Sequence, residues 1–199
     1  RGHADRTVIN GHTAEYWGYQ YAGNWSSYSV PQIMGFREEV FKPHVSIKQS
    51  NPMYADPLRA SPLKDYYKFV RFTLTKAMLC DLYYCYQDKY SANDYWHRYY
   101  DEYDLNIGYP TSEMEPIGST DVWVRFFEGG VAVCNVTGQK ITVTDADLRT
   151  LSAYDGPYYR FKGGQDPDFN NGQLFQSVEL DAEVFKSYEV DVLNGDGII

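Results

Sequence analysis

Aromatic and acidic side chains are concentrated in one short segment of this sequence, Tyr95–Pro110, which reads YWHRYYDEYDLNIGYP. Flat aromatic rings stack on the apolar faces of sugar rings, and carboxylates accept hydrogen bonds from hydroxyl groups or transfer protons. This mixture is typical of a carbohydrate site. A packed loop, in which the tyrosine rings are buried and their hydroxyl groups stay solvated, explains the same residues, and composition alone favours the packed loop.

Two aromatic side chains and three acids in this segment are the candidates for direct contact with a sugar: Trp96, Tyr99, Asp101, Glu102 and Asp104. Glycoside hydrolysis uses one pair of carboxyl groups, so three acids this close together cannot all be catalytic. We expect some of them to be solvated, to pair with Arg98 or to cap a turn.

Glu15 is the strongest single candidate for a catalytic residue, as a general acid or a nucleophile. It lies in the segment Thr13–Trp17 (TAEYW), after an expected strand at Thr7–Asn10. Barrel enzymes gather their catalytic residues at the carboxyl ends of strands. Trp17 is a further candidate for stacking on the sugar. The alternatives are a salt-bridged or solvent-exposed glutamate and a tryptophan that belongs to the core.

The composition limits the partners and cofactors of the chain. It has 199 residues, a formal net charge of -9 and a pI near 4.8, which argues against nucleic acid because phosphate binding needs a basic surface. No segment approaches the ~18 consecutive apolar residues of a membrane helix. No P-loop, GxGxxG, HExxH or GxSxG motif occurs, and the cysteines lack zinc-site spacing. We therefore expect neither a cofactor nor a metal.

Three further motifs have a simpler structural explanation. Asp166–Gly172 (DPDFNNG) is polar enough for a calcium loop, but a turn with positive φ at Asn171-Gly172 is preferred. The tail Asp191–Ile199 resembles the opening of a calcium loop that lacks its closing acidic ligand. Asn24-Trp-Ser26 and Asn135-Val-Thr137 are glycosylation sequons, which often occur by chance. The cysteines form either one disulfide with one free thiol or three thiols.

The clearest secondary-structure element is a helix over Pro62–Cys80. Ser61 suits the N-cap, Pro62 fits the first helical position, and apolar residues recur at spacings of three and four. The other elements expected in this part of the chain are three strands and one short helix: Thr7–Asn10, Pro43–Lys48, Leu82–Tyr86 and the helix Val30–Val40. Alternating strands and helices are typical of an α/β layer or barrel.

After Pro110 the pattern changes to short strands separated by Gly, Asp and Asn. Glu128-Gly129-Gly130 predicts a hairpin turn. The expected strands are Val122–Phe127, Val131–Val136, Ile141–Thr144, Tyr158–Phe161, Leu174–Leu180 and Val184–Val192. Such spacing predicts an antiparallel β-sandwich. The fold class is therefore α/β plus all-β, with a barrel-like region over residues 1–115 and a β-sandwich over residues 116–199.

The succession of these motifs resembles the C-terminal part of glycoside-hydrolase-like (β/α)8-barrel proteins with a small C-terminal β-domain. The matching positions are Arg71-Phe72, Tyr99–Asp104, Gly108–Pro110, Phe127–Gly130 and Asn135–Thr137. The resemblance implies a secreted or cell-surface protein that binds carbohydrate and hydrolyses glycosidic bonds, with Glu15 as acid or nucleophile. A non-catalytic carbohydrate-binding or structural protein that uses the same scaffold is the alternative.

The chain is short for this resemblance. A complete (β/α)8 barrel needs about 200–250 residues, whereas residues 1–115 supply only the later strands and helices of a TIM-like barrel. An open half-barrel exposes a strand edge and half of a core. We therefore expect an N-terminal partner fragment or self-association, and a second catalytic acid from an earlier strand outside this sequence.

Overall fold

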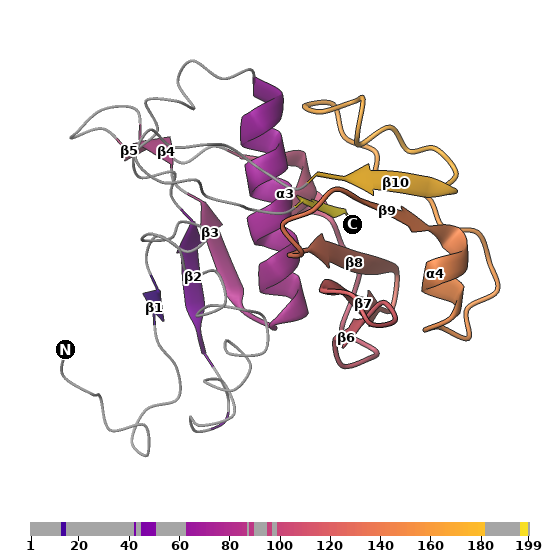
Figure 1. Ribbon diagram of the computed structural model, residues 1–199. Helices are drawn as coiled ribbons and strands as arrows, with labels where there is room; N and C mark the ends of the chain where they lie inside the picture. The colour runs from indigo at the N-terminus through magenta and orange to yellow at the C-terminus, as the bar shows by residue number, and fades with distance from the viewer. Residues whose placement is uncertain are drawn as a thin grey trace.

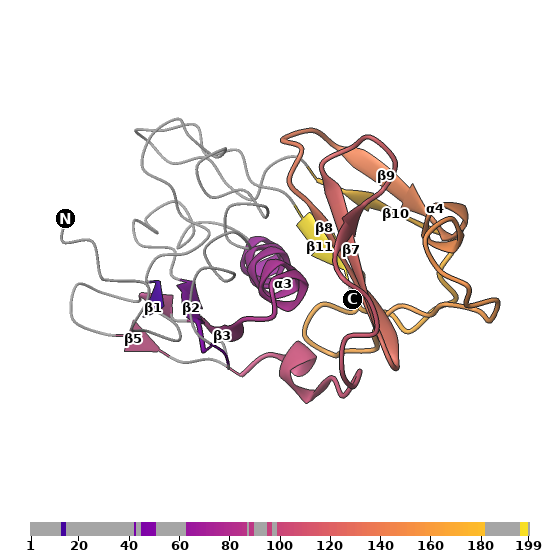
Figure 2. The ribbon, with the colours of Figure 1, turned by 90° about the horizontal axis from the view of Figure 1, so that it is seen from below.

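The computed structural model of this chain describes residues 13–14, 42, 45–50, 63–86, 88–89, 95–96, 99–181 and 196–198. A long helix, α3 (Leu63–Leu79), lies in the middle, with a small parallel sheet on one side and antiparallel strands on the other (Figure 1, Figure 2). The mixture of helix and antiparallel sheets expected from the sequence is confirmed. The described strands do not close into a barrel.

Helix α3 agrees with the expected helix over Pro62–Cys80 to within one residue at each end. Its apolar residues are buried on both sides, because the helix lies between two sheets: Phe69, Val70, Phe72, Ala77 and Leu79. Thr73 and Thr75 are buried as well, and their hydroxyl groups donate to carbonyl oxygens one turn earlier at 2.9 and 2.8 Å. The apolar spacing in the sequence predicts one buried stripe, whereas the helix is buried on two sides.

Three short parallel strands form a sheet in the order β1-β2-β3: β1 (Thr13–Ala14), β2 (Ile47–Ser50) and β3 (Tyr83–Tyr86). Helix α3 connects β2 to β3, which is the β-α-β unit that the alternating pattern predicts. A two-stranded ribbon follows β3 along the chain: β4 (Asp88–Lys89) and β5 (Tyr95–Trp96). The expected strand Thr7–Asn10 and helix Val30–Val40 lie outside the described residues.

The second region contains two antiparallel sheets that share one core. The larger sheet has the order β11-β8-β7-β6, formed by β6 (Glu115–Pro116), β7 (Val122–Phe127), β8 (Gly130–Asn135) and β11 (Asp196–Ile198). The smaller sheet pairs β9 (Ile141–Thr144) with β10 (Ser177–Leu180). Val122, Val124 and Phe126 alternate along β7 and pack into the core that the smaller sheet lines. The expected hairpin of β7 and β8 is confirmed.

Parts of this region differ from the sequence expectation. A short helix, α4 (Asp145–Arg149), follows β9 and starts with a capping box between Thr144 and Asp147. Residues 158–161 were expected as a strand but form a single isolated bridge, between Tyr159 and Leu174, because the following turn leaves the sheet toward α3. In the calcium-loop-like tail, Asp196–Ile198 forms an edge strand beside β8. The expected strand Val184–Val192 lies outside the described residues.

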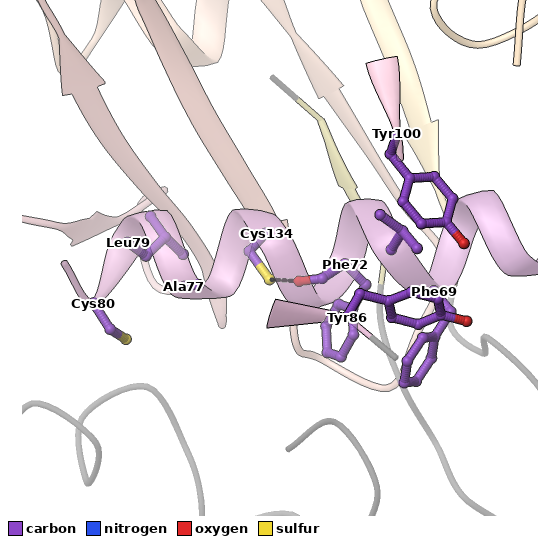
Figure 3. Packing of buried hydrophobic residues seen from close by; sticks show 9 residues of the cluster. Phe69, Phe72, Ala77, Leu79, Cys80, Tyr86, Tyr100 and Cys134 are labelled. Carbon is purple, nitrogen blue, oxygen red and sulfur yellow. Dashed lines mark hydrogen bonds between the residues drawn. The ribbon is translucent and has the colours of Figure 1, made fainter. Parts of the chain in front are cut away.

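Buried aromatic rings and one thiol join α3 to both sheets (Figure 3). Tyr86 of β3 packs against Tyr100 and Phe69, with ring centroids 5.4 and 5.9 Å apart. The Cys134 thiol of β8 donates to the carbonyl oxygen of Phe72 at 3.9 Å. One cluster of buried side chains therefore includes residues from both regions.

Arg125 of β7 fixes the carboxyl end of α3. Its buried guanidinium donates to the carbonyl oxygens of Met78 and Leu79, both at 3.1 Å, and to that of Ser112 at 3.2 Å. The last carbonyl groups of a helix have no partner within the helix, and a cation there also opposes the negative end of the helix dipole. Helix α3 and strand β7 are therefore held as one unit.

Candidate functional site

The aromatic–acidic segment is extended at Tyr100 and then forms a short 3-10 helix, η2 (Asp101–Asp104). Tyr100 anchors the segment, because its buried ring packs edge to face against Tyr86 and Tyr103 with centroids 5.4 and 5.8 Å apart. Packing therefore explains this tyrosine without a ligand.

Asp101 holds residues 163–170 of the antiparallel region against η2, and we call these residues the docking loop. The Asp101 Oδ2 atom accepts hydrogen bonds from the backbone N–H groups of Gly164 and Gln165, at 2.6 and 2.9 Å. The Gln165 side chain completes the contact, since its oxygen accepts from the backbone N–H of Asp101 and its nitrogen donates to the carbonyl of Tyr99, both at 2.9 Å. Docking of the loop thus accounts for the Asp101 carboxylate.

Two further contacts fix the docking loop. Buried Glu102 accepts a hydrogen bond through Oε1 from Asn170 Nδ2 at 2.6 Å. Arg71 of α3 pairs with Asp166, and its guanidinium carbon lies 3.7 Å from the ring centroid of Phe169. The sequence pattern places Arg71 in a helix motif but does not reveal its role here, because its partner is 95 positions away.

Tyr99, Tyr103 and Asp104 form the exposed side of the segment, which we call the Tyr99 face. Tyr99 is 59% exposed and Tyr103 is 36% exposed, and their rings pack edge to face with centroids 5.6 Å apart. The Tyr99 hydroxyl donates to Asp104 Oδ1, and this hydrogen bond raises the pKa of Tyr99. The face therefore presents an oriented aromatic ring beside a carboxylate.

A hollow of about 310 Å³ shares a residue with the Tyr99 face, and we call it the Glu102 hollow. Its described lining comes from α3, β3, η2 and the residue after η2: Leu74, Met78, Tyr84, Glu102, Tyr103 and Leu105. Tyr103 belongs to both the hollow and the face, and its ring centroid lies 6.2 Å from that of Tyr84. The Tyr84 hydroxyl is hydrogen-bonded to Thr73 at 2.7 Å. Apolar surface and one carboxyl group therefore dominate the hollow.

The structure brings four of the predicted site residues together: Tyr99, Asp101, Glu102 and Asp104. Glu15 and Trp17 lie outside the described residues, and β1 ends at Ala14, immediately before Glu15 in the sequence. Trp96 lies in β5 with its backbone paired to Asp88, and its side chain is not among those described. A catalytic role for Glu15 stays a prediction.

The polar segment Asp166–Gly172 forms the turn that the sequence analysis preferred over a calcium loop. The Asp166 carbonyl oxygen accepts from the backbone N–H groups of Phe169 and Asn170, at 3.1 and 2.7 Å. Gly172 has a φ of 69°, which a side-chain-bearing residue rarely adopts. Within the described part of the chain, no group of three His, Cys, Asp or Glu side chains is placed to hold a metal. The three cysteines are free thiols.

Asn135 lies in a sequon but has a structural role that the sequence analysis did not identify. It is fully buried, and its Nδ2 donates to the carbonyl oxygens of Gln139, Leu180 and Asp181 at 2.8, 3.3 and 3.1 Å. Its Oδ1 accepts from the backbone N–H and the hydroxyl of Thr137. A buried amide with these partners is closed to glycosylation in the folded protein. The Asn-Val-Thr-Gly order, typical of a turn, is the signal that points to this role.

No family model matches this chain, and no curated protein matches its sequence. None of the described helices is both long enough and apolar enough to cross a membrane. The resemblance to glycoside-hydrolase-like proteins therefore stays a prediction. The Tyr99 face and the Glu102 hollow are the described features whose geometry bears on function.

Proposed function

We propose that this chain is a carbohydrate-active polypeptide of the glycoside-hydrolase-like type, which contacts its sugar through the Tyr99 face. The observation that carries the proposal is the exposed ring of Tyr99, whose hydroxyl is held by Asp104 beside the ring of Tyr103. A ring oriented in this way stacks on a sugar with a small loss of side-chain entropy. A carboxylate accepts several hydrogen bonds, so Asp104 also accepts from sugar hydroxyl groups.

The parallel sheet supports a site that extends toward Glu15. Strands β1 and β3 run in the same direction, so Glu15 and the aromatic segment both follow carboxyl ends of strands in the sequence. In α/β folds, substrates bind outside these ends. We propose glycoside hydrolysis with Glu15 as general acid or nucleophile, which requires a second carboxyl group roughly 5 to 10 Å away. We further propose, from the resemblance, that the protein acts outside the cell or at its surface.

A non-catalytic carbohydrate-binding or structural role is the second candidate. It is favoured by the contacts of Asp101 and Glu102 with the docking loop, which leave Asp104 as the solvent-facing acid of η2. One carboxylate beside an aromatic ring is enough to bind a sugar. It is not enough for hydrolysis by a pair of carboxyl groups.

Exposed apolar side chains lie in the parallel sheet, at Ile47 and Tyr83, and just before β2, at Val45. Parallel sheets are usually covered on both faces. We therefore propose that self-association or an N-terminal partner fragment covers this sheet. Sedimentation velocity over a range of concentrations tests self-association. A 23.0 kDa monomer at every concentration would contradict self-association and leave the partner fragment as the proposal.

Affinity gel electrophoresis with a panel of polysaccharides tests the Tyr99 face. We expect Tyr99→Ala to weaken binding about two- to twelvefold, because a stacked ring contributes on the order of 0.5–1.5 kcal/mol. Tyr109→Ala is the matched control, since Tyr109 is 79% exposed and makes no ring contact among the described residues. Equal retardation of the parent and the Tyr99→Ala variant, or an equal loss in both variants, contradicts the proposal.

Release of reducing sugars from the same panel separates hydrolysis from binding alone. A Glu15→Gln variant that binds polysaccharide but releases no product supports catalysis by Glu15. Glu113→Gln removes an exposed carboxylate elsewhere and is expected to keep full activity. Equal release by the parent and Glu15→Gln removes Glu15 from the mechanism. Binding without release in the parent favours the second candidate.

A further inference from the structure

The Glu102 hollow combines an apolar lining with one carboxyl group. Five apolar or aromatic side chains line it beside Glu102: Leu74, Met78, Tyr84, Tyr103 and Leu105. Its volume of about 310 Å³ lies at the lower end of the ~300–1,000 Å³ range of small-molecule sites. It therefore suits one sugar-sized group rather than a longer segment of chain. Of the described lining residues, Glu102 alone carries an acidic or basic group.

The carboxyl group of Glu102 is held in one orientation with an oxygen to spare. Glu102 is 7% exposed, and its Oε1 accepts from Asn170 Nδ2 at 2.6 Å. No hydrogen bond to Oε2 occurs within the described part of the chain. Oε2 is not among the buried side-chain atoms of the described residues that lack a partner, so it faces the hollow, where a donor or a cation can bind it. An ammonium group is the strongest partner, because charge-assisted hydrogen bonds are about twice as strong as neutral ones.

The aromatic residues connect the hollow to the Tyr99 face. The Tyr103 ring centroid lies 6.2 Å from that of Tyr84 inside the hollow and 5.6 Å from that of Tyr99 on the face. The faces of such rings attract cations. The net charge of -9 adds a long-range attraction for cationic ligands. A sugar stacked on Tyr99 therefore lies next to a site whose charge and rings favour an amine.

We propose that the Glu102 hollow binds the ammonium group of an amino sugar, so that the carbohydrate recognised by this chain carries free amino groups. The inference rests on the proposed carbohydrate function and adds the substrate class to it. Glu102 is the ionic partner, and the rings of Tyr84 and Tyr103 flank the cation.

Isothermal titration calorimetry with three tetrasaccharides tests this assignment: the glucosamine oligomer, its N-acetylated form and cellotetraose, which share one backbone. The titrations are run at about pH 6, where the free amine is protonated. We expect the parent to bind the glucosamine oligomer about tenfold more tightly than cellotetraose, because a charged hydrogen bond replaces a neutral one. Acetylation of the amine is expected to remove the preference.

Two variants locate the preference in the hollow. Glu102→Gln keeps an acceptor for Asn170 but removes the charge. The preference for the glucosamine oligomer over cellotetraose is therefore expected to fall about tenfold. Leu105→Trp fills the hollow and leaves Glu102 in place, and the same loss is expected. Glu113→Gln removes an equal charge from an exposed site and is expected to keep the ratio, which excludes general attraction to an acidic protein. Circular dichroism verifies that each variant is folded.

The outcomes separate this inference from the proposed function. Equal affinity of the parent for the amino and neutral oligomers overturns the amino-sugar assignment and leaves carbohydrate binding standing. A preference that survives in both Glu102→Gln and Leu105→Trp also overturns the assignment. Absence of binding to all three oligomers and to the polysaccharide panel overturns both proposals.

Discussion

Asn135 joins the end of β8 to two other parts of the chain. Its Nδ2 reaches the carbonyl oxygens of Gln139, Leu180 and Asp181, while its Oδ1 accepts from Thr137. The site needs a donor and an acceptor on one short side chain. Asparagine provides both, whereas an ionised aspartate provides acceptors only.

We expect Asn135→Asp to lower the free energy of unfolding by roughly 2–4 kcal/mol, because a buried carboxylate would face three carbonyl oxygens. Urea denaturation followed by tyrosine fluorescence measures the change. Asn106→Asp is the matched control at an exposed position, where a change below about 0.5 kcal/mol is expected. An equally small change in both variants would show that the Asn135 amide does not stabilise the fold.

The sequence predicts that Asp101 and Asp104 are acids of the candidate site, but it does not predict their different roles. Both acids were candidates for sugar contact, and they lie three residues apart in η2. Asp101 accepts two backbone N–H groups of the docking loop, whereas Asp104 accepts the Tyr99 hydroxyl at the surface. Residue type and local spacing do not separate these roles. The difference arises from a contact 63 positions away, which no local pattern predicts.

Among the elements, those with strong local signals are predictable and those fixed by distant contacts are not. Helix α3 has a favourable N-cap residue and a helical spacing of apolar residues, and β7 is rich in β-branched and aromatic residues before a glycine turn. Residues 158–161 resemble a strand locally but make a single isolated bridge, since the docking loop turns toward α3. The burial of polar residues on α3 depends on the second sheet, which the helix sequence alone does not reveal.

Because α3 is covered on both sides, the side chain of Lys76 is buried and its pKa is lowered. Burial lowers the pKa of Lys76 from 10.5 to about 8, against the opposing effect of Cys134 and Cys80. Between these two pH values the unfolded chain holds a proton that the folded chain has lost. The free energy of unfolding therefore rises as the pH increases from about 8 to about 10.5.

We expect this gain to be on the order of 3 kcal/mol, because each pKa unit corresponds to about 1.4 kcal/mol. Stability curves of the parent and of Lys76→Met between pH 7 and pH 11 measure it. The difference between the two curves is the relevant quantity, because it removes the contribution of the other titrating groups. That difference is expected to change with pH, whereas Lys162→Met at an exposed site is expected to give a curve parallel to the parent. Parallel curves for Lys76→Met would contradict the lowered pKa.

At the scale of the whole molecule, α3 is shared between the two regions. Arg125 binds its carboxyl end, Cys134 contacts its middle, and Arg71 pairs with Asp166 in the docking loop. The sequence predicts the order of the elements and a change of pattern near residues 111–120. It does not predict these contacts, because each joins side chains that are distant along the chain. We infer that the two described regions unfold together.

The docking loop provides the test of this coupling, because Asp101 holds it through two backbone N–H groups. We expect Asp101→Ala to lower the free energy of unfolding by roughly 1–3 kcal/mol and to speed hydrogen–deuterium exchange at Gly164 and Gln165. Asp168→Ala is the control, since it removes an exposed carboxylate from the same loop. If both variants exchange at the parent's rate, Asp101 does not hold the loop, and its carboxylate returns to the set of candidates for sugar contact. If exchange rises only in Asp101→Ala while the single unfolding transition is kept, the docking loop couples the two regions. Asp104 then remains the solvent-facing acid of the Tyr99 face.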